Sequence, residues 1–217
     1  MEMTLDQIGF EKGIKALIIY PMNALANDQI KRLRKLLKGT KITFGAYTGE
    51  TETKQEKAVA KYRKLNNNTD PIDNELISRE AIKENPPHLL ITNYAMLEYL
   101  MIRPADNSLF SGSYADNWKF VVLDEAHTYT GATGIEVAML LKRLKARLNT
   151  DNTIQYILTS ATLGTSENDN NEVVNFANTL CSVDNFKSEN NSMKNDIEGL
   201  GNILEFLMQN IRHCLLQ

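Results

Sequence analysis

The stretch W-K-F-V-V-L-D-E-A-H-T-Y-T-G-A-T-G (residues 118–134) runs from a short apolar segment into two adjacent carboxylates. Its F-V-V-L run is continuously apolar, which is typical of a strand that is covered on both faces of a sheet. Asp124 and Glu125 follow at once, so they stand where that strand ends. Ligands of open parallel sheets bind outside the carboxyl ends of the strands, and the pair is therefore a candidate site.

Four further apolar runs also predict strands, which makes five with the run before Asp124. Four of these five runs are continuously apolar rather than alternating. Segments whose apolar residues recur at helical spacing separate them. Strands that alternate with helices predict an α/β domain with a doubly wound, mainly parallel sheet. We expect strands at residues 16–20, 42–48, 89–92, 120–124 and 156–161, and helices between them at 24–37, 94–102 and 135–148.

The polar and charged residues 51–88 interrupt this alternation. They predict a helix at 52–65, a loop around N-N-N-T-D-P, and a second helix at 74–84. We interpret the segment as a helical insertion before the strand at 89–92. Its composition indicates no chemistry.

A second polar region, residues 164–198, is rich in Asn, Asp, Glu and Ser and predicts a loop around one helix at 172–180. We therefore expect one domain over residues 1–181 and a polar linker over 182–198. Residues 199–217 follow as an amphipathic C-terminal helix, with apolar residues on one face.

The composition excludes several classes of protein. A net charge of −3 provides no overall field for nucleic acid, and the basic stretches at 31–38 and 142–147 predict either solvated helix faces or a phosphate track. No apolar run approaches the roughly 18 residues of a membrane span, and no signal peptide is visible, so we expect an intracellular, cytoplasmic protein without a membrane partner. Cys181 and Cys214 have no spacing typical of a disulfide framework or zinc site.

The two carboxylates have three possible interpretations. One can hold Mg²⁺, directly or through water, while the other orients or deprotonates an attacking water, as phosphoryl transfer requires. The plain alternative is an acidic turn before the helix that starts near Gly134. A metal hydrolase that uses Asp124, Glu125 and His127 directly is the third, although His88 and His213 are remote in sequence and no H-x-x-x-H pattern is present.

Asp124-Glu125-Ala126-His127 spells the DEAH form of motif II of superfamily 2 helicases, and other stretches resemble motifs of that family in the family's order. More narrowly, the chain resembles the YprA-like DEAD/DEAH-box DNA helicases over roughly residues 14–181. The resemblance implies a RecA-like fold and ATP hydrolysis coupled to movement along a nucleic-acid strand. The stretches are Y-P-M-N-A-L-A-N-D-Q (20–29, motif Ia), Y-T-G-E (47–50, motif Ib), I-T-N-Y-A-M-L (91–97) and S-A-T (160–162, motif III).

The resemblance also implies roles for the residues around the carboxylates. Asp124 would bind Mg²⁺, through water, and Glu125 would activate the water that attacks ATP. His127, Ser160 and Thr162 would relay the state of the nucleotide to the strand-binding surface. The plain alternatives are a hydrogen-bonded histidine at a helix start and hydroxyls that cap a strand end or helix.

The turns of the other motifs would contact nucleic acid, and the implied partner is single-stranded DNA. Pro21 ends its strand and Asn23 can cap the next helix, so free backbone N–H groups there would face a phosphate. Each turn alone is also ordinary turn chemistry. The residues implied in this contact are Pro21, Asn23, Thr48, Gly49, Thr92 and Asn93.

The phosphate-binding P-loop (Walker A) of this family has the pattern G-x-x-x-x-G-K-[ST], which does not occur in the 217 residues. The nearest stretch, G-F-E-K-G-I-K at 9–15, has the wrong spacing. We therefore expect a first RecA-like lobe without its P-loop strand, inactive alone although the complete enzyme would use Mg²⁺ and ATP. The alternative is a non-enzymatic nucleic-acid-binding or regulatory module that completes a partner chain.

Loss of the P-loop strand would leave the strand at 156–161 as an exposed apolar edge. Such edges promote aggregation or the addition of another strand. We expect this edge to be covered by the terminal segment, by a second copy of the chain or by a partner chain.

Overall fold

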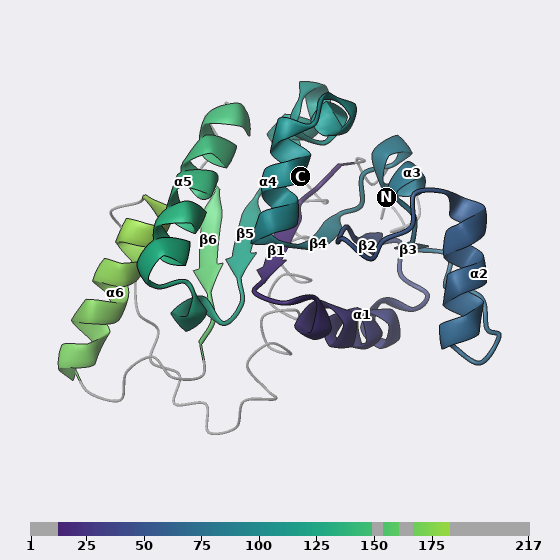
Figure 1. Ribbon diagram of the computed structural model, residues 1–217, viewed down its shortest axis with the longest axis horizontal. Helices are drawn as coiled ribbons and strands as arrows, with labels where there is room; N and C mark the ends of the chain where they lie inside the picture. The colour runs from purple at the N-terminus through teal and green to yellow at the C-terminus, as the bar shows by residue number, and fades with distance from the viewer. Residues whose placement is uncertain (1–12, 149–153, 161–166, 183–217) are drawn as a thin grey trace, which may run out of the picture.

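The computed structural model describes residues 13–148, 154–160 and 167–182, which form a six-stranded sheet in the order β3-β2-β4-β1-β5-β6 (Figure 1). All pairings between these strands are parallel, which confirms the predicted doubly wound α/β architecture. The strands are β1 (Ala16–Tyr20), β2 (Phe44–Ala46), β3 (Glu75–Leu76), β4 (Leu89–Asn93), β5 (Phe120–Leu123) and β6 (Gln155–Leu158).

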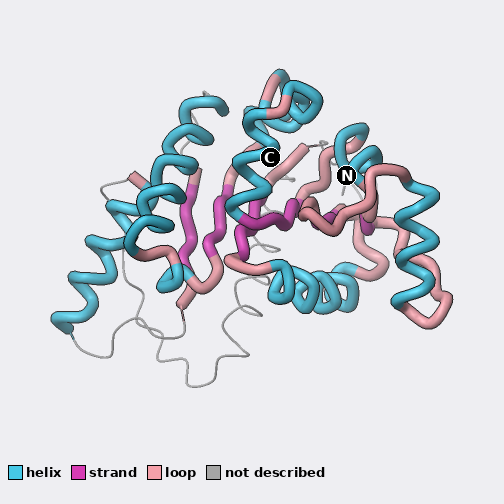
Figure 2. The backbone as a smooth tube through the Cα atoms, viewed as in Figure 1, coloured by secondary structure: helices cyan, strands magenta, loops and turns pink. Residues whose placement is uncertain are grey.

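Helices cover both faces of the sheet (Figures 1 and 2). On one face α1 (Asn23–Leu37) packs on Ile18, Ile91 and Val122, the middle residues of the central strands. On the other face α4 (Tyr94–Ile102), α5 (Gly131–Leu148) and α6 (Glu167–Cys181) enclose a second core. Short 3-10 helices at Pro104–Phe110, Gly112–Asn117 and Ala126–Thr128 complete the described connections.

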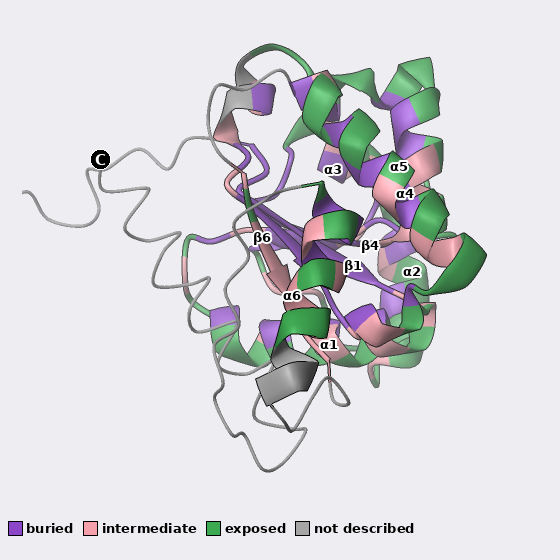
Figure 3. Cartoon of the chain, turned by 90° about the vertical axis from the view of Figure 1, so that its left-hand side faces the viewer, coloured by how far each residue is buried: buried purple, intermediate pink, exposed green. Residues whose placement is uncertain are grey.

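The central strands are apolar throughout because their alternate residues serve these two cores. In β1 all five residues are buried; Leu17 and Ile19 join the core under α4 and α5, whereas Ala16, Ile18 and Tyr20 join the core under α1. Figure 3 shows these buried strands beneath helices whose outer faces are exposed. Two-sided burial was the reason for predicting parallel strands here, and the packing confirms it.

The insertion differs from the prediction. Its first helix, α2 (Gln55–Leu65), forms, but residues 74–78 are not helical, and the short strand β3 adds to the sheet beside β2. The buried Asn74 side chain donates to the carbonyls of Leu37 and Ile42, at 2.9 and 2.8 Å, which draws this segment into the sheet layer. The helix α3 (Arg79–Glu84) therefore begins only at Arg79, where the Ser78 hydroxyl accepts from the Ala81 amide.

The other expected elements were correct in kind and differ at their ends. The strand expected at 42–48 is limited to Phe44–Ala46, and the one expected at 156–161 is Gln155–Leu158. The helix α5 begins at Gly131, four residues before the first apolar position of its pattern, and α6 extends over Glu167–Cys181. The predicted linker and C-terminal helix, apart from Ser182, lie outside the described residues.

Within the described ranges β6 is an edge strand whose residues are only partly buried. The terminal segment expected to cover it lies outside these ranges, and coverage by a second copy or a partner chain stays a prediction. Among the described helices, none has the length and apolar character needed to cross a membrane.

Candidate functional site

The site residues predicted from the sequence, Thr162 excepted, lie along the carboxyl ends of the strands, which we call the carboxyl edge of the sheet. Since the strands are parallel, the carboxyl ends of β2, β4, β1, β5 and β6 lie side by side in that order. This arrangement brings together turns that are far apart in the chain, from Pro21 after β1 to Ser160 after β6. Thr48 and Gly49 follow β2, Thr92 and Asn93 end β4, Pro21 and Asn23 follow β1, Asp124, Glu125 and His127 follow β5, and Ser160 follows β6; Thr162 lies outside the described residues.

The turn after β5 has an unusual backbone. Glu125 adopts the left-handed conformation, with φ 51° and ψ 47°, although it is not a glycine. A left-handed non-glycine residue costs on the order of 1–3 kcal/mol and persists only where its surroundings hold it. The turn is short: Asp124 directly follows the last strand residue, and His127 already lies in the following 3-10 helix.

Thr159 is the residue that holds this turn, and the sequence pattern gave no sign of it. Its hydroxyl donates to the Asp124 carboxylate and lies 3.3 Å from the Glu125 amide, from which it accepts. Its backbone carbonyl accepts from the Ala126 amide at 2.7 Å, and its amide donates to the Leu123 carbonyl at 3.0 Å. The pairing of Leu123 with Leu158 makes Thr159 the cross-strand neighbour of Asp124, a signal that required the strand register.

His127 connects the turn with the end of β6. Its Nδ1 atom lies 2.9 Å from the Ser160 hydroxyl and 3.3 Å from Oε2 of Glu125. The imidazole therefore lies between the Glu125 carboxylate and the Ser160 hydroxyl. The structure thus brings together two of the three residues expected to relay nucleotide state.

Asp124 sits in an environment that penalises its charge. Burial raises the pKa of its carboxyl above the ordinary value, the hydrogen bond from Thr159 lowers it, and the neighbouring Glu125 charge raises it. In turn, burial and the charge of Asp124 hold the pKa of Tyr20 well above its ordinary value. A cation placed beside Asp124 would relieve this penalty.

The ends of β1 and β4 are joined by an amide pair. Asn93 donates from Nδ2 to Oδ1 of Asn23 at 2.7 Å, and its own Oδ1 accepts from the Met96 amide, which caps α4. The expectation that Asn23 caps α1 was wrong, because the cap position falls on Met22. The Asn23 side chain instead fixes the distance between two neighbouring turns.

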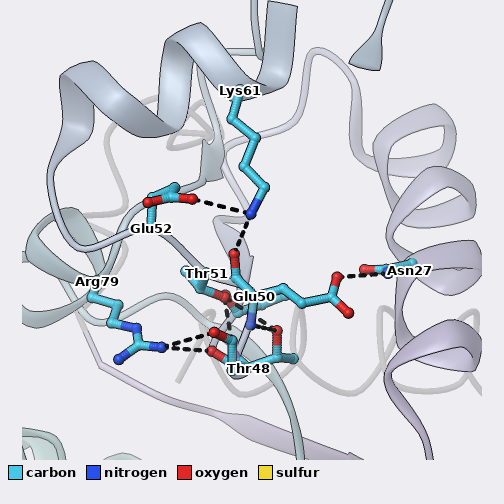
Figure 4. A network of polar contacts seen from close by, with 9 residues as sticks. Asn27, Thr48, Glu50, Thr51, Glu52, Lys61 and Arg79 are labelled. Atoms are coloured by element: carbon cyan, nitrogen blue, oxygen red, sulfur yellow. Dashed lines mark hydrogen bonds and ion pairs between the residues drawn. The ribbon is translucent and has the colours of Figure 1, made fainter. Parts of the chain in front are cut away.

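The turn after β2 is fixed from several sides (Figure 4). Thr48 is buried, whereas Gly49 and the following Glu50 are exposed. The Thr92 hydroxyl is fully buried and donates to the Tyr47 carbonyl at 2.7 Å, so it ties β4 to this turn from inside. Arg79 and Lys61, both from the insertion, bind carbonyl groups of the turn.

The carboxylate ligands at the carboxyl edge fit a magnesium ion whose other ligands are water and phosphate. Asp124 provides carboxylate oxygens at the carboxyl end of β5. Oε2 of Glu125 is buried and accepts no hydrogen bond from the described residues. Among the described residues no group of three or more His, Cys, Asp and Glu side chains could hold a metal. One carboxylate with water and phosphate ligands is the usual arrangement for Mg²⁺, whereas a metal hydrolase needs a fuller set.

The profile of the DEAD/DEAH box helicase family matches residues 3–170, and the chain belongs to this family. Druantia protein DruE of Escherichia coli (strain UMEA 4076-1) is 32% identical over 238 aligned residues, which cover 71% of this chain and 13% of that protein. The uncharacterized ATP-dependent helicase YprA of Bacillus subtilis (strain 168) is 28% identical over 143 residues, 65% of this chain and 16% of that protein. The predicted resemblance is thereby confirmed.

Solved structures agree with the fold. The DUF1998 helicase MrfA bound to DNA aligns with a TM-score of 0.54 and 27% identity, over 78% of this chain and 20% of that one. The Mycobacterium smegmatis helicase Lhr has the same fold, with a TM-score of 0.52. The described domain is therefore RecA-like, as expected. The chain spans less than a quarter of the length of each of these proteins.

Proposed function

We propose that the chain is part of the first RecA-like lobe of an ATP-dependent DNA helicase, in which ATP hydrolysis drives movement along a nucleic-acid strand. The observation that carries the proposal is the position of the DEAH turn. This turn, which follows β5, lies at the same end of the sheet as the turns after β1, β4 and β2. Such proximity supports a motor, because neighbouring turns in contact can carry a change at the nucleotide to the nucleic-acid strand.

On the nucleotide side, Asp124 would hold Mg²⁺ through water and Glu125 would activate the attacking water. The Thr159 hydroxyl donates to the Asp124 carboxylate and accepts from the Glu125 amide, and these bonds support the two roles because they fix the carboxylate and the strained turn together. His127, Ser160 and Thr162 would carry the change of state to the nucleic-acid side. The contact between His127 and Ser160 supports the first step of this relay.

On the nucleic-acid side, the backbone of single-stranded DNA would run along the turns after β1, β4 and β2. The exposed Gly49, the Asn23–Asn93 pair and the helix start after Pro21 would contact phosphates. Thr48 and Thr92, which are buried, would hold these turns rather than touch DNA. The similarity to MrfA, a helicase whose structure is solved bound to DNA, supports this choice of partner.

The 217 residues lack the P-loop pattern, so we expect them not to hydrolyse ATP alone. The same observation favours a second candidate, a nucleic-acid-binding or regulatory module that completes a partner chain. Under either candidate, the partly buried edge strand β6 would pair with a second copy or a partner chain.

Substitution of the catalytic carboxylate separates the two candidates. ATP turnover is measured in a complex of this chain with a chain that supplies a P-loop and second lobe, with DNA present. If this chain is part of the enzyme, Glu125→Gln lowers turnover by about 100-fold or more and leaves DNA binding intact. Glu136→Gln, a matched change at an exposed position of α5, leaves turnover unchanged. Equal turnover in both variants would support the regulatory module.

A further inference from the structure

The insertion, for which the sequence indicated no chemistry, binds the backbone of the turn after β2 (Figure 4). Nη2 of Arg79 donates to the carbonyl of Thr48 at 3.0 Å and to that of Gly49 at 3.3 Å. The Arg79 guanidinium also lies over the ring of Tyr47, 5.2 Å from its centroid. The Arg79 side chain therefore contacts three successive residues, Tyr47, Thr48 and Gly49.

Lys61, on α2, continues this pattern. Its ammonium donates to the Glu50 carbonyl at 2.6 Å and to the Glu52 carboxylate at 3.1 Å. The carbonyls of residues 48, 49 and 50 are thus each bound by a cation from residues 51–88.

The bound carbonyls determine where the amides of the turn point. In a trans peptide the C=O and the following N–H face opposite ways, and no cis bond occurs in the described backbone. Each of the Gly49, Glu50 and Thr51 amides therefore points opposite to the carbonyl of its own peptide, the one that Arg79 or Lys61 binds. The Glu50 amide donates to the Thr48 hydroxyl and the Thr51 amide to the Thr48 carbonyl, whereas the Gly49 amide has no partner among the described residues.

The surroundings of Gly49 leave room for a ligand. A Cβ atom added to Gly49 would meet nothing within 4 Å, and the residue is exposed. Arg79 itself is directed inward, since its Nε atom is buried. The guanidinium therefore holds the turn on the side of the Thr48 and Gly49 carbonyls.

The insertion is in turn docked firmly. Within the segment, the amides of Arg79 and Glu80, at the start of α3, donate to the carbonyls of Glu52 and Thr53, at 2.9 and 3.1 Å, which joins its two ends. On the other side of the sheet, Arg34 of α1 forms a double ion pair with Glu75 of β3, both contacts at 2.7 Å. The segment is therefore a fixed support rather than a loose loop.

We propose that residues 51–88 act as a brace for the strand-binding turn, with Arg79 as the main positioning residue and Lys61 as the second. The brace orients the Gly49 amide toward a backbone phosphate of the nucleic acid. Arg79 makes no contact with the phosphate itself. This inference rests on the proposed function, because it assumes that the turn binds a nucleic-acid backbone.

Binding of fluorescent oligothymidine to the 217-residue chain, measured at several salt concentrations, tests the brace. Arg79→Lys keeps the positive charge but loses the hydrogen bonds to the Thr48 and Gly49 carbonyls, and Arg79→Gln loses both the charge and these bonds. We expect each substitution to weaken DNA binding by about tenfold. Because no phosphate contact is lost, the salt dependence stays that of the unsubstituted chain. Arg63→Gln removes one charge from the same insertion, at an exposed pair with Asp70, and changes affinity by less than about twofold.

Two results would overturn the brace. Wild-type affinity of Arg79→Lys would mean that only charge matters, and a salt dependence reduced by about one ion would mean that Arg79 touches a phosphate. Hydrogen exchange at the Glu50 and Thr51 amides tests the brace without DNA: faster exchange in Arg79→Lys, but not in Arg63→Gln, supports it, and unchanged exchange rejects it. If the unsubstituted chain binds no DNA, the proposed function fails, and the exchange result alone decides the brace.

Discussion

Two turns at the same edge of the sheet are held in different ways. The turn after β5, with Asp124 and Glu125, is fixed by Thr159 at the end of the neighbouring strand. The turn after β2, with Thr48 and Gly49, is fixed by Arg79 and Lys61 of a segment that follows it in the chain. The first turn depends on strand register and the second on the segment of residues 51–88. The two can therefore be disturbed separately.

The largest effect is expected where the insertion joins the sheet. A Cβ atom at Gly45 of β2 would lie 2.7 Å from the Leu76 carbonyl of β3 and 3.2 Å from Cδ1 of Ile82. Gly45→Ala should therefore lower the free energy of unfolding by about 2–3 kcal/mol, measured by urea denaturation, and increase hydrogen exchange in the turn after β2. Gly49→Ala, with open space around the new methyl, should change stability by less than about 0.5 kcal/mol. Equal stability of the two variants would contradict the close approach of β3.

The second prediction concerns the other turn. Thr159→Val removes the hydroxyl that serves the Asp124 carboxylate and the Glu125 amide, and leaves a buried charge less well satisfied. We expect a loss of about 2 kcal/mol in the free energy of unfolding. Thr159→Ser keeps the hydroxyl and should lose much less. A valine variant as stable as the serine variant would show that the turn holds itself.

Much of the first turn was predictable from sequence, whereas its support was not. The continuous apolar run before Asp124 placed the carboxylates at a buried strand end, and the packing confirms this. The role of Thr159 could not be read in advance, because it follows from the pairing of β5 with β6 across a gap of 35 residues. Nothing in the pattern D-E-A-H indicates a left-handed Glu125 either, since glycine is the usual residue there.

The support of the second turn was still less predictable. The strand β3 has two residues, too few for any periodic pattern, and its place in the sheet depends on the buried bonds of Asn74. Arg79 belongs to a charged stretch that looks like a solvated helix face. Only the fold shows that its guanidinium is turned toward the carbonyls of Thr48 and Gly49.

A smaller effect, of opposite sign, is expected from the strained residue itself. Glu125→Gly relieves the left-handed conformation and should raise the free energy of unfolding by about 1 kcal/mol. Glu125→Gln keeps the strain and should leave stability unchanged. Denaturation of both variants checks this, and a destabilised glycine variant would mean that the side chain of Glu125 supports the fold.

The smallest effect is a pH dependence of stability. Burial raises the pKa of Asp124 in the folded chain, so the folded state binds more protons than the unfolded state between the ordinary pKa of an aspartate and this raised value. The contribution of Asp124 to stability therefore falls as the pH rises through that window. Denaturation across the window should show this decrease in the unsubstituted chain, and a smaller decrease in Asp124→Asn. An identical pH profile in the two proteins would contradict the burial of a charged carboxylate.

The measurement that tests the central claim most directly is calorimetric titration of the 217-residue chain with oligothymidine of about 20 nucleotides, and with Mg²⁺–ATP in its presence and absence. The carboxyl edge as proposed binds the DNA with an affinity that falls as salt rises, and the missing P-loop pattern leaves Mg²⁺–ATP unbound in both titrations. Absence of DNA binding at low salt would contradict the assignment of the edge. Micromolar binding of Mg²⁺–ATP would show that another segment holds the phosphates.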